Sequence, residues 1–431
     1  MSAGLILYNA LAALAFLLSW PFLLAACLCG REGKWRGRCG AVPRTKARPL
    51  WLHASSVGEV NAIAPLVAGL RKHAPGSAIA LSTMTATGQR RARESFGDAV
   101  TTFFFPLDFF WIQASALRRL DPALVVLVET ELWPNLLWLC HRRNIPVVLA
   151  NARLSQRSLP QYRRFAFLFT PLLNTIGTIA CQSEADAERY RSLGVRPDIV
   201  RVLGNMKYDA IKGPVTPGEK KKLRDDLGIP ADSFVLTAGS TREGEELLVI
   251  DAWQAVRQSS KFQITNPKLV IAPRHPDRFG AVEAMLRERE LGFVKRSEQR
   301  GAHDNRAFDV LLLDTLGELV KAYAASDLAF VGGSLVPVGG HNPLEPAALG
   351  LPVIFGPHMF NAKESADGLL AAGGAKQVTT ANELSDAIAE LMGDSQKRAQ
   401  MGQRAKLVVN DMRGATKLTV DLITDVLGSV R

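Results

Sequence analysis

The charged side chains that could do chemistry in the first half of the chain each follow a short apolar run. Glu59 lies at the start of an expected helix, where its carboxylate could take a proton from a hydroxyl group or could serve only as a helix cap. Glu129 and Glu131 could form a weak metal site, but pairing with lysine or arginine is the simpler interpretation. Lys207 could bind a phosphate or a sugar carboxylate, or it could be an ordinary solvated lysine.

The second half of the chain offers residues suited to binding an anion. Arg274 ends a buried apolar run, and its planar guanidinium can bind phosphate or carboxylate through two hydrogen bonds. Residues 314–318 end the next run and open a helix, and residues 332–345 follow a third run. Three segments that follow strands of one parallel sheet would meet at the same edge of that sheet. They therefore predict one nucleotide-sized pocket.

Residues 332–357 read GGSLVPVGGHNPLEPAALGLPVIFGP and join a strand, a glycine loop, a short helix and another strand. Pro343 and Pro346 suit the first turn of that helix, where no hydrogen-bond donor is lost. Such a loop can direct free N–H groups and a positive helix end at a phosphate, and Glu345 could accept from ribose hydroxyls. Tight turns and a helix cap are the alternative interpretation of the glycines and prolines.

Short apolar strands alternate with helices along most of the chain, which predicts parallel sheets covered on both faces. The expected strands are 50–53, 78–82, 125–128, 147–150, 179–181, 234–240, 269–275, 310–314, 328–331 and 353–355. We expect one Rossmann-like domain over 49–213 and a second over 214–431 that includes the C-terminal helices. An α/β protein with two such domains facing each other across a cleft has the GT-B architecture. Transferases, epimerases and phosphorylases share it, so the architecture alone does not decide the function.

Residues 1–30 carry no charged side chain, and 5–29 are almost continuously apolar, long enough to cross a bilayer as a helix. A basic segment, 31–48, follows this run, and a cleaved signal peptide would carry its charges before it. We therefore expect an uncleaved N-terminal membrane anchor with the rest of the protein on the cytoplasmic side. Because Pro21 interrupts the run, a helix lying in the membrane surface is the alternative. Aromatic stretches at 103–111 and 162–167 could pack in the core or enter the membrane interface.

The composition describes a globular protein of two domains, with 431 residues, 47% hydrophobic and 22% charged. A net charge of +11 favours an anionic partner such as nucleic acid, an acidic membrane face or a phosphorylated substrate. The five scattered cysteines suggest neither a disulfide framework nor a zinc site. The common nucleotide-loop, dinucleotide and zinc motifs and a D-x-D sequence are all absent, so the sequence demands no metal and no bound cofactor.

Eight segments, in order across nearly the whole chain, resemble motifs of the bacterial 3-deoxy-D-manno-octulosonic acid (Kdo) transferases of lipopolysaccharide synthesis. They are HASSVGE (53–59), STMTATG (82–88), ETELWPN (129–135), NARLSQRS (151–158), GNMKYD (204–209), PRHPDRF (273–279), DTLGEL (314–319) and FVGGSLVPVGGHNPLEPAALGLPVIFGPH (330–358). The resemblance implies a GT-B enzyme that is inverting and metal-independent, uses CMP-Kdo and a lipid A precursor of the lipid IVA type, and works at the cytoplasmic face of the inner membrane. It implies no nucleic acid partner.

The resemblance also implies roles for individual residues. Glu59 would be the general base, and Glu129 and Lys207 would stabilise the transition state. The residues that would hold CMP are Pro273, Arg274, Leu316, Gly317, Glu318, Asn342, Pro343, Leu344 and Glu345. Leu316 replaces the methionine common in the family, a change of similar volume. The rival functions are a GT-B enzyme for a UDP-sugar, either a transferase or an epimerase, and a membrane-tethered binding module without catalysis.

Overall fold

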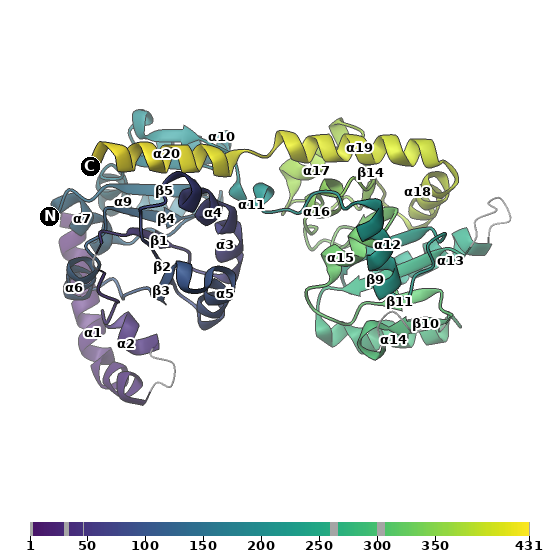
Figure 1. Cartoon of the computed structure of the whole chain (residues 1–431), viewed down its shortest axis with the longest axis horizontal. Helices are drawn as coiled ribbons and strands as arrows, with labels where there is room; N and C mark the ends of the chain where they lie inside the picture. Colours follow the sequence, from purple (N-terminus) through teal and green to yellow (C-terminus); the bar gives the residue numbers. More distant parts are fainter. Residues whose placement is uncertain (1–2, 30–33, 46, 259–265, 300–306, 431) are drawn as a thin grey trace. The chain divides into compact units, whose positions relative to one another are not determined.

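The computed structural model describes residues 3–29, 34–45, 47–258, 266–299 and 307–430. The chain forms two compact units (Figure 1): Met1–Ala210 with Met412–Arg431, and Ile211–Asp411. The units change close to the expected boundary at 213–214, and each is built on a parallel sheet, as the alternating pattern predicted.

The first unit contains a seven-stranded parallel sheet in the order β3-β2-β1-β4-β5-β6-β7. Its strands are β1 (Leu50–His53), β2 (Ile79–Thr83), β3 (Thr101–Phe104), β4 (Leu124–Val128), β5 (Val147–Ala152), β6 (Thr178–Cys181) and β7 (Val200–Val202). Its helices are α1 (Ala3–Cys29), α2 (Lys34–Arg38), α3 (Val57–Ala62), α4 (Ala64–His73), α5 (Ala86–Phe96), α6 (Phe110–Leu120), α7 (Pro134–Arg142), α8 (Leu159–Arg164), α9 (Ala166–Leu173), α10 (Glu184–Ser192), α11 (Met206–Asp209) and α20 (Ala415–Val430). The strand order reverses between β1 and β4, so the loops that follow these two strands are neighbours.

The second unit contains another seven-stranded parallel sheet, in the order β10-β11-β9-β8-β12-β13-β14. Its strands are β8 (Val235–Thr241), β9 (Lys268–Pro273), β10 (Phe293–Lys295), β11 (Val310–Leu312), β12 (Leu328–Val331), β13 (Val353–Phe355) and β14 (Ala375–Gln377). Its helices are α12 (Pro217–Asp226), α13 (Glu246–Gln258), α14 (Phe279–Glu288), α15 (Leu319–Ala325), α16 (Leu344–Ala348), α17 (Lys363–Ala371), α18 (Ala381–Gly393) and α19 (Ser395–Asp411). Here the order reverses between β8 and β12.

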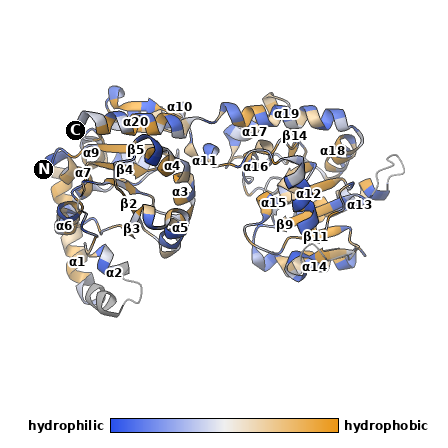
Figure 2. Ribbon diagram, in the orientation of Figure 1, coloured by the Kyte–Doolittle hydropathy of each residue, from blue (hydrophilic) through white to orange (hydrophobic). Residues whose placement is uncertain are grey.

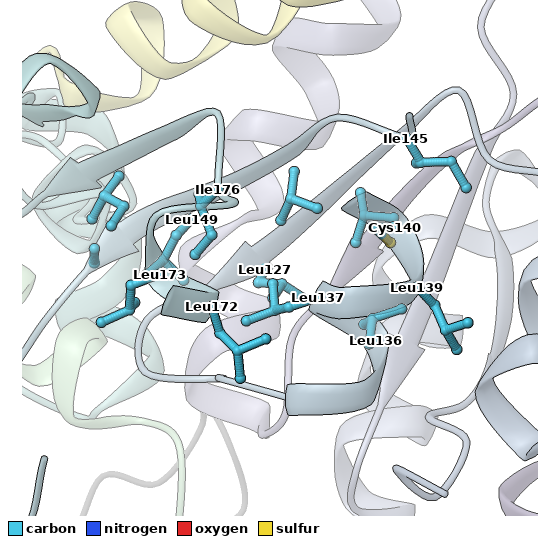
Figure 3. Close-up of a cluster of buried hydrophobic side chains, with 14 of the residues drawn as sticks. Leu127, Leu136, Leu137, Leu139, Cys140, Ile145, Leu149, Leu172, Leu173 and Ile176 are labelled. Carbon is cyan, nitrogen blue, oxygen red and sulfur yellow. The ribbon is translucent and has the colours of Figure 1, made fainter. Parts of the chain in front are cut away.

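All ten expected strands are present, because their continuous apolar runs are buried on both faces of a sheet. In β4, Val125 and Leu127 pack with α7 and α9, while Leu124, Val126 and Val128 pack with α3 and α4 on the other face. Figure 3 shows part of the first of these cores around Leu127 and Leu149. The structure adds four strands, β3, β7, β10 and β14, which lie at or near the sheet edges and are short.

The C-terminal helix corrects one expected boundary. Residues 412–431 were expected in the second domain, but α20 packs on α4 in the first unit (Figure 1). Val420, Ile423 and Leu427 form a buried stripe at helical spacing in the same core as α3 and α4. Asp209 accepts from the backbone N–H of Gly414 at 2.7 Å and of Thr416 at 2.6 Å, which caps α20. The stripe completes a core of the first unit, although the order of elements along the chain places α20 after the second unit.

Helix α1 covers the expected anchor and continues through Pro21. In the described part of the chain, its segment Ala3–Pro21 alone is long and apolar enough to cross a membrane, and the coloured part of α1 in Figure 2 is predominantly hydrophobic. One face packs on the first unit: Leu5 is fully buried, and the Tyr8 hydroxyl donates to Asp108 at 3.0 Å. The other face exposes large apolar side chains, which are Ile6, Leu7, Leu11, Leu14, Leu17, Leu18 and Trp20.

The two aromatic stretches divide between core and surface. Phe103, Phe104 and Phe105 are buried, so the core-packing interpretation holds for them. The side chains of Phe110, Trp111, Phe165 and Phe167 are each at least 40% exposed. The ring of Phe16 in α1 contacts Phe109 and Trp111 edge-on, with both pairs of centroids 5.1 Å apart. The exposed ring of Trp111 in α6 therefore lies next to α1, whereas the ring of Phe110 pairs with Trp138 of α7.

Candidate functional site

Glu59 stands in the first turn of α3, just beyond the end of β1. Its carboxylate accepts a hydrogen bond from the Ser55 N–H at 2.7 Å and from the Ser56 hydroxyl at 2.9 Å. Burial raises the pKa of Glu59, the two hydrogen bonds lower it, and the charges of Glu129 and Glu131 raise it again, so that it lies above its ordinary value. Glu59 thus closes the helix start, and its pKa is shifted in the direction that suits a general base.

Glu129 follows β4, next to the loop after β1, and pairs with Lys207. The Lys207 Nζ lies 2.7 Å from Glu129 Oε1. Glu129 has a positive φ of 64°, an uncommon backbone conformation for a non-glycine residue that clusters at functional sites. The structure therefore brings together two of the predicted catalytic residues, which stand far apart in the sequence.

Asn151 positions the lysine. It follows the apolar run of β5, has a φ of 53°, and its Oδ1 accepts from the Met206 N–H at 2.9 Å. Asn205 in turn caps the short helix α11 by accepting from the Lys207 N–H at 3.0 Å. The motif at 151–158 predicted no role for Asn151. An asparagine directly after a buried apolar run was the available signal.

His53 and Glu131 form a second pair that sequence reasoning missed. His53 is fully buried, its Nδ1 lies 2.9 Å from the Ser82 hydroxyl, and its Nε2 lies 3.5 Å from Glu131 Oε2. Burial raises the pKa of Glu131, but its contacts with His53 and neighbouring groups lower the pKa by more. Two nearby carboxyls, Glu59 and Glu131, are thus shifted in opposite directions, an arrangement that separates an acid–base group from a permanently charged one.

In the second unit, four side chains after β8, β9 and β12 form a basic cluster, which we call the arginine–histidine cluster: Arg242, Arg274, His275 and His341. The Arg242 Nε donates to His341 Nε2 at 3.2 Å, and its guanidinium also contacts His275 Nε2. Burial and the charges of Arg242, Arg274 and His275 lower the pKa of His341 to about 4. Only Arg274 of these four was a predicted site residue. Arg242 and His275 stand close to strand ends, which was the available signal for them, whereas His341 lies further along the loop after β12.

The glycine loop does not offer the free N–H groups that its sequence predicted. Glu245 is fully buried, and its carboxylate accepts from the backbone N–H groups of Gly333, Ser334 and Leu335. The expected phosphate cradle is therefore wrong at these three residues, because an internal carboxylate already occupies them. Gly332 is required here, since a Cβ atom would lie 2.7 Å from Glu245 Oε1.

The other predicted nucleotide-binding residues lie at two places. Asn342 Oδ1 accepts from the Leu344 N–H at 3.1 Å, just before the short helix α16. Burial raises the pKa of Glu345 above its ordinary value, against smaller opposing effects of Asn342 and the Arg274 charge. Arg274 and Glu345 are thus close enough to interact.

Residues 316–318 follow β11 in a turn in which Leu316 is 73% exposed and Gly317 has a φ of 86°. Glu318 is held by Arg296, whose NH2 nitrogen lies 3.1 Å from its carboxylate. Among the described residues, no group of three or more His, Cys, Asp or Glu side chains is arranged to hold a metal ion. Metal independence stays a prediction.

Comparison with known proteins identifies the family. A family model described as 3-deoxy-D-manno-octulosonic-acid transferase (kdotransferase) matches residues 33–210, and one described as glycosyl transferases group 1 matches residues 220–408. The 3-deoxy-D-manno-octulosonic acid transferase of Haemophilus influenzae is 37% identical over 377 residues, covering 87% of this chain and 86% of the relative. This chain belongs to the Kdo transferases. The 3-deoxy-D-manno-octulosonic acid transferase of Bordetella pertussis is 34% identical over 398 residues, covering 91% of each protein.

A solved structure supports the architecture. The UDP-GlcNAc 2-epimerase from Neisseria meningitidis bound to UDP-GlcNAc is 15% identical to this Kdo transferase, with a TM-score of 0.59 over 88% of this chain and 100% of the epimerase. At that identity the likeness shows the fold alone. The expected GT-B class and the recognised family are both confirmed, and the protein is a glycosyltransferase of lipopolysaccharide biosynthesis.

Proposed function

We propose that this transferase moves Kdo from CMP-Kdo to a lipid A precursor of the lipid IVA type, a phosphorylated and acylated glucosamine disaccharide. Family membership supports the transferred sugar. The observation that carries the catalytic part is the group of side chains after β1 and β4, where Glu59 has a raised pKa and Glu129 pairs with Lys207. In parallel α/β sheets, ligands bind at such a reversal of strand order.

The proposed reaction is a single displacement. Glu59 takes the proton of an acceptor hydroxyl while the hydroxyl oxygen forms a bond to the anomeric carbon of Kdo, and the bond from that carbon to the phosphate oxygen of CMP breaks. One displacement inverts the configuration at the anomeric carbon. Lys207, oriented by Glu129, supplies positive charge to the transition state. We propose that the reaction needs no metal ion.

For the nucleotide we propose the residues after β9, β11 and β12. Arg274, following Pro273, binds the phosphate through its guanidinium. In this turn Leu316 and Gly317 are exposed and suit contact with the nucleotide, while the Glu318 carboxylate beside them is held by Arg296. The segment of Asn342, Pro343, Leu344 and Glu345 presents an amide and a half-buried carboxyl, groups that suit the ribose hydroxyls.

The decisive measurement is mass spectrometry of the lipid A precursor after incubation with the protein, while a synthetase generates CMP-Kdo in the same tube. We expect a mass gain by whole Kdo units, at an unchanged rate when a chelator is added. A folded protein that adds no Kdo but is protected from thermal unfolding by UDP, and not by CMP, would overturn the proposal in favour of a UDP-sugar enzyme. Product NMR reports the anomeric configuration, and retention would refute the single displacement.

We further propose that α1 holds the protein at the cytoplasmic face of the inner membrane by lying in the membrane surface. Crossing the bilayer would withdraw Leu5 from the core and Tyr8 from the buried Asp108. The exposed apolar face of α1, with Trp111 beside it, suits the acyl boundary, and the net charge of +11 suits anionic lipids.

The test of this position uses Ala3→Cys in a protein whose Cys27, Cys29 and Cys39 are changed to serine. The two remaining cysteines, Cys140 and Cys181, are buried. An impermeant maleimide should label residue 3 in inverted vesicles and not in intact spheroplasts. Labelling from the periplasmic side would show that α1 crosses the membrane and would refute the in-plane position.

A further inference from the structure

The Arg242 guanidinium is held by two histidines. Its side chain contacts the imidazoles of His341 and His275, and its backbone N–H donates to Glu245 at 2.8 Å. Within the part of the chain that the structure describes, the Arg242 and Arg274 side chains form no ion pair with a carboxylate. The low pKa of His341 makes it a neutral hydrogen-bond acceptor at pH 7. The guanidinium charges of Arg242 and Arg274 both act on the neutral His341, and an anion would balance them.

The cluster lies at the strand reversal of the second sheet. Arg242 directly follows β8, the strand between β9, which Arg274 follows, and β12, which precedes the loop of His341. The turn that carries Arg242 is fixed, because Ser240 has a φ of 57° and Glu245 ties the turn to the loop 333–335. The guanidinium therefore needs little reorganisation to bind a ligand.

Two guanidinium groups whose charges both act on His341 match a donor that carries two anions close together. In CMP-Kdo the anomeric carbon bears both the carboxylate of the sugar acid and the oxygen that links it to the phosphate, whereas the anomeric carbon of an aldose bears no carboxylate. Resting on the function proposed above, we propose that Arg242, held by His275 and His341, binds the carboxylate of the donor sugar, while Arg274 binds the phosphate. Arg242 would then be a specificity residue that distinguishes sugar acids from neutral sugars.

The test compares CMP, which has only the phosphate, with CMP-Kdo, which has both anions. Arg242→Gln should leave the Kd of CMP within about twofold by calorimetry and raise the KM of in-place-generated CMP-Kdo by roughly 10- to 100-fold, the range for one charge-assisted contact. Arg274→Gln should raise both the Kd of CMP and the KM of CMP-Kdo. The exposed Arg287→Gln, on α14, is the matched control and should change neither.

Each outcome decides. If Arg242→Gln weakens the binding of CMP as much as that of CMP-Kdo, Arg242 is a phosphate ligand and the proposal fails. If the variant changes neither the Kd of CMP nor the KM of CMP-Kdo, the donor does not contact Arg242 and the proposal also fails. Arg242→Lys keeps the charge and loses the planar fork of the guanidinium. Its KM for CMP-Kdo should lie between those of Arg242→Gln and wild type. Failure of the wild-type protein to turn over CMP-Kdo would refute the proposed function itself, which separates that failure from one seen only in the variants.

Discussion

Replacing Glu59 with glutamine tests the proposed base with little change in structure. The carboxylate accepts from the Ser55 N–H and the Ser56 hydroxyl. A glutamine can keep both contacts, since its carbonyl oxygen can accept from the N–H and its amide can donate to the hydroxyl oxygen. We therefore expect the free energy of unfolding of Glu59→Gln to stay within about 1 kcal/mol of wild type.

The chemical step should respond very differently. General-base catalysis contributes about 10²- to 10⁴-fold, so kcat should fall by that factor, which corresponds to about 3–5 kcal/mol of transition-state stabilisation. KM for the acceptor should change little, because the amide keeps the shape of the carboxyl. The assay is the initial rate of Kdo addition by mass spectrometry, and Glu94→Gln, an exposed glutamate on α5, is the matched control.

The pH dependence adds a second criterion. Burial and the neighbouring carboxylates raise the pKa of Glu59, so the base form appears at a higher pH than for an ordinary glutamate. The acid limb of kcat/KM should therefore lie above the ordinary glutamate range in wild type and vanish in Glu59→Gln. A folded variant that keeps more than a tenth of the rate, or that keeps the same acid limb, would refute the assignment.

Four further predictions concern other parts of the structure. Glu245→Ala leaves buried N–H groups without an acceptor and should lower the free energy of unfolding by about 3–5 kcal/mol in denaturant titrations; a loss under about 1 kcal/mol would contradict the role assigned to this carboxylate. Lys207→Ala should lower kcat by roughly 10²-fold with under about 1 kcal/mol of destabilisation, because its ion pair is partly exposed; full activity would exclude a catalytic role. Ile423→Ala should destabilise the first unit by about 2–4 kcal/mol, seen as faster hydrogen exchange in α4, while the exposed Leu418→Ala changes little. Burial raises the pKa of Asp108 to about 7, so the folded state binds the proton more tightly, and stability should fall as pH rises from roughly 4 to 7; Asp108→Asn should remove this dependence, and an unchanged pH profile would show that Asp108 is not its source.

Part of the site could be predicted because it depends on local order along the chain. Glu59, Glu129 and Arg274 each follow an apolar run, and residues after parallel strands meet at one edge. The pairing of Glu129 with Lys207 could not be predicted in the same way. It depends on the orientation of α11 after β7, which Asn151 fixes from the end of another strand.

The glycine loop shows how a local pattern can mislead. Gly332 and Gly333 suit a phosphate cradle by composition, but Glu245 reaches the loop from a turn 88 residues earlier in the chain. A glycine needed for the close approach of an internal carboxylate has the same sequence signature as a glycine needed for a ligand. The Arg242 contacts with two histidines were hidden for the same reason, because they join the ends of three strands.

The sequence by itself determined the two parallel sheets, the family motifs and the apolar character of α1, because these depend on the burial of contiguous residues. Only the tertiary structure decided that α20 returns to the first unit, that one face of α1 packs against it, and that the Arg242 side chain pairs with histidines and with no carboxylate among the described residues. Those features depend on which surfaces and charges meet across long separations in the chain. Residue types alone do not specify such long-range contacts.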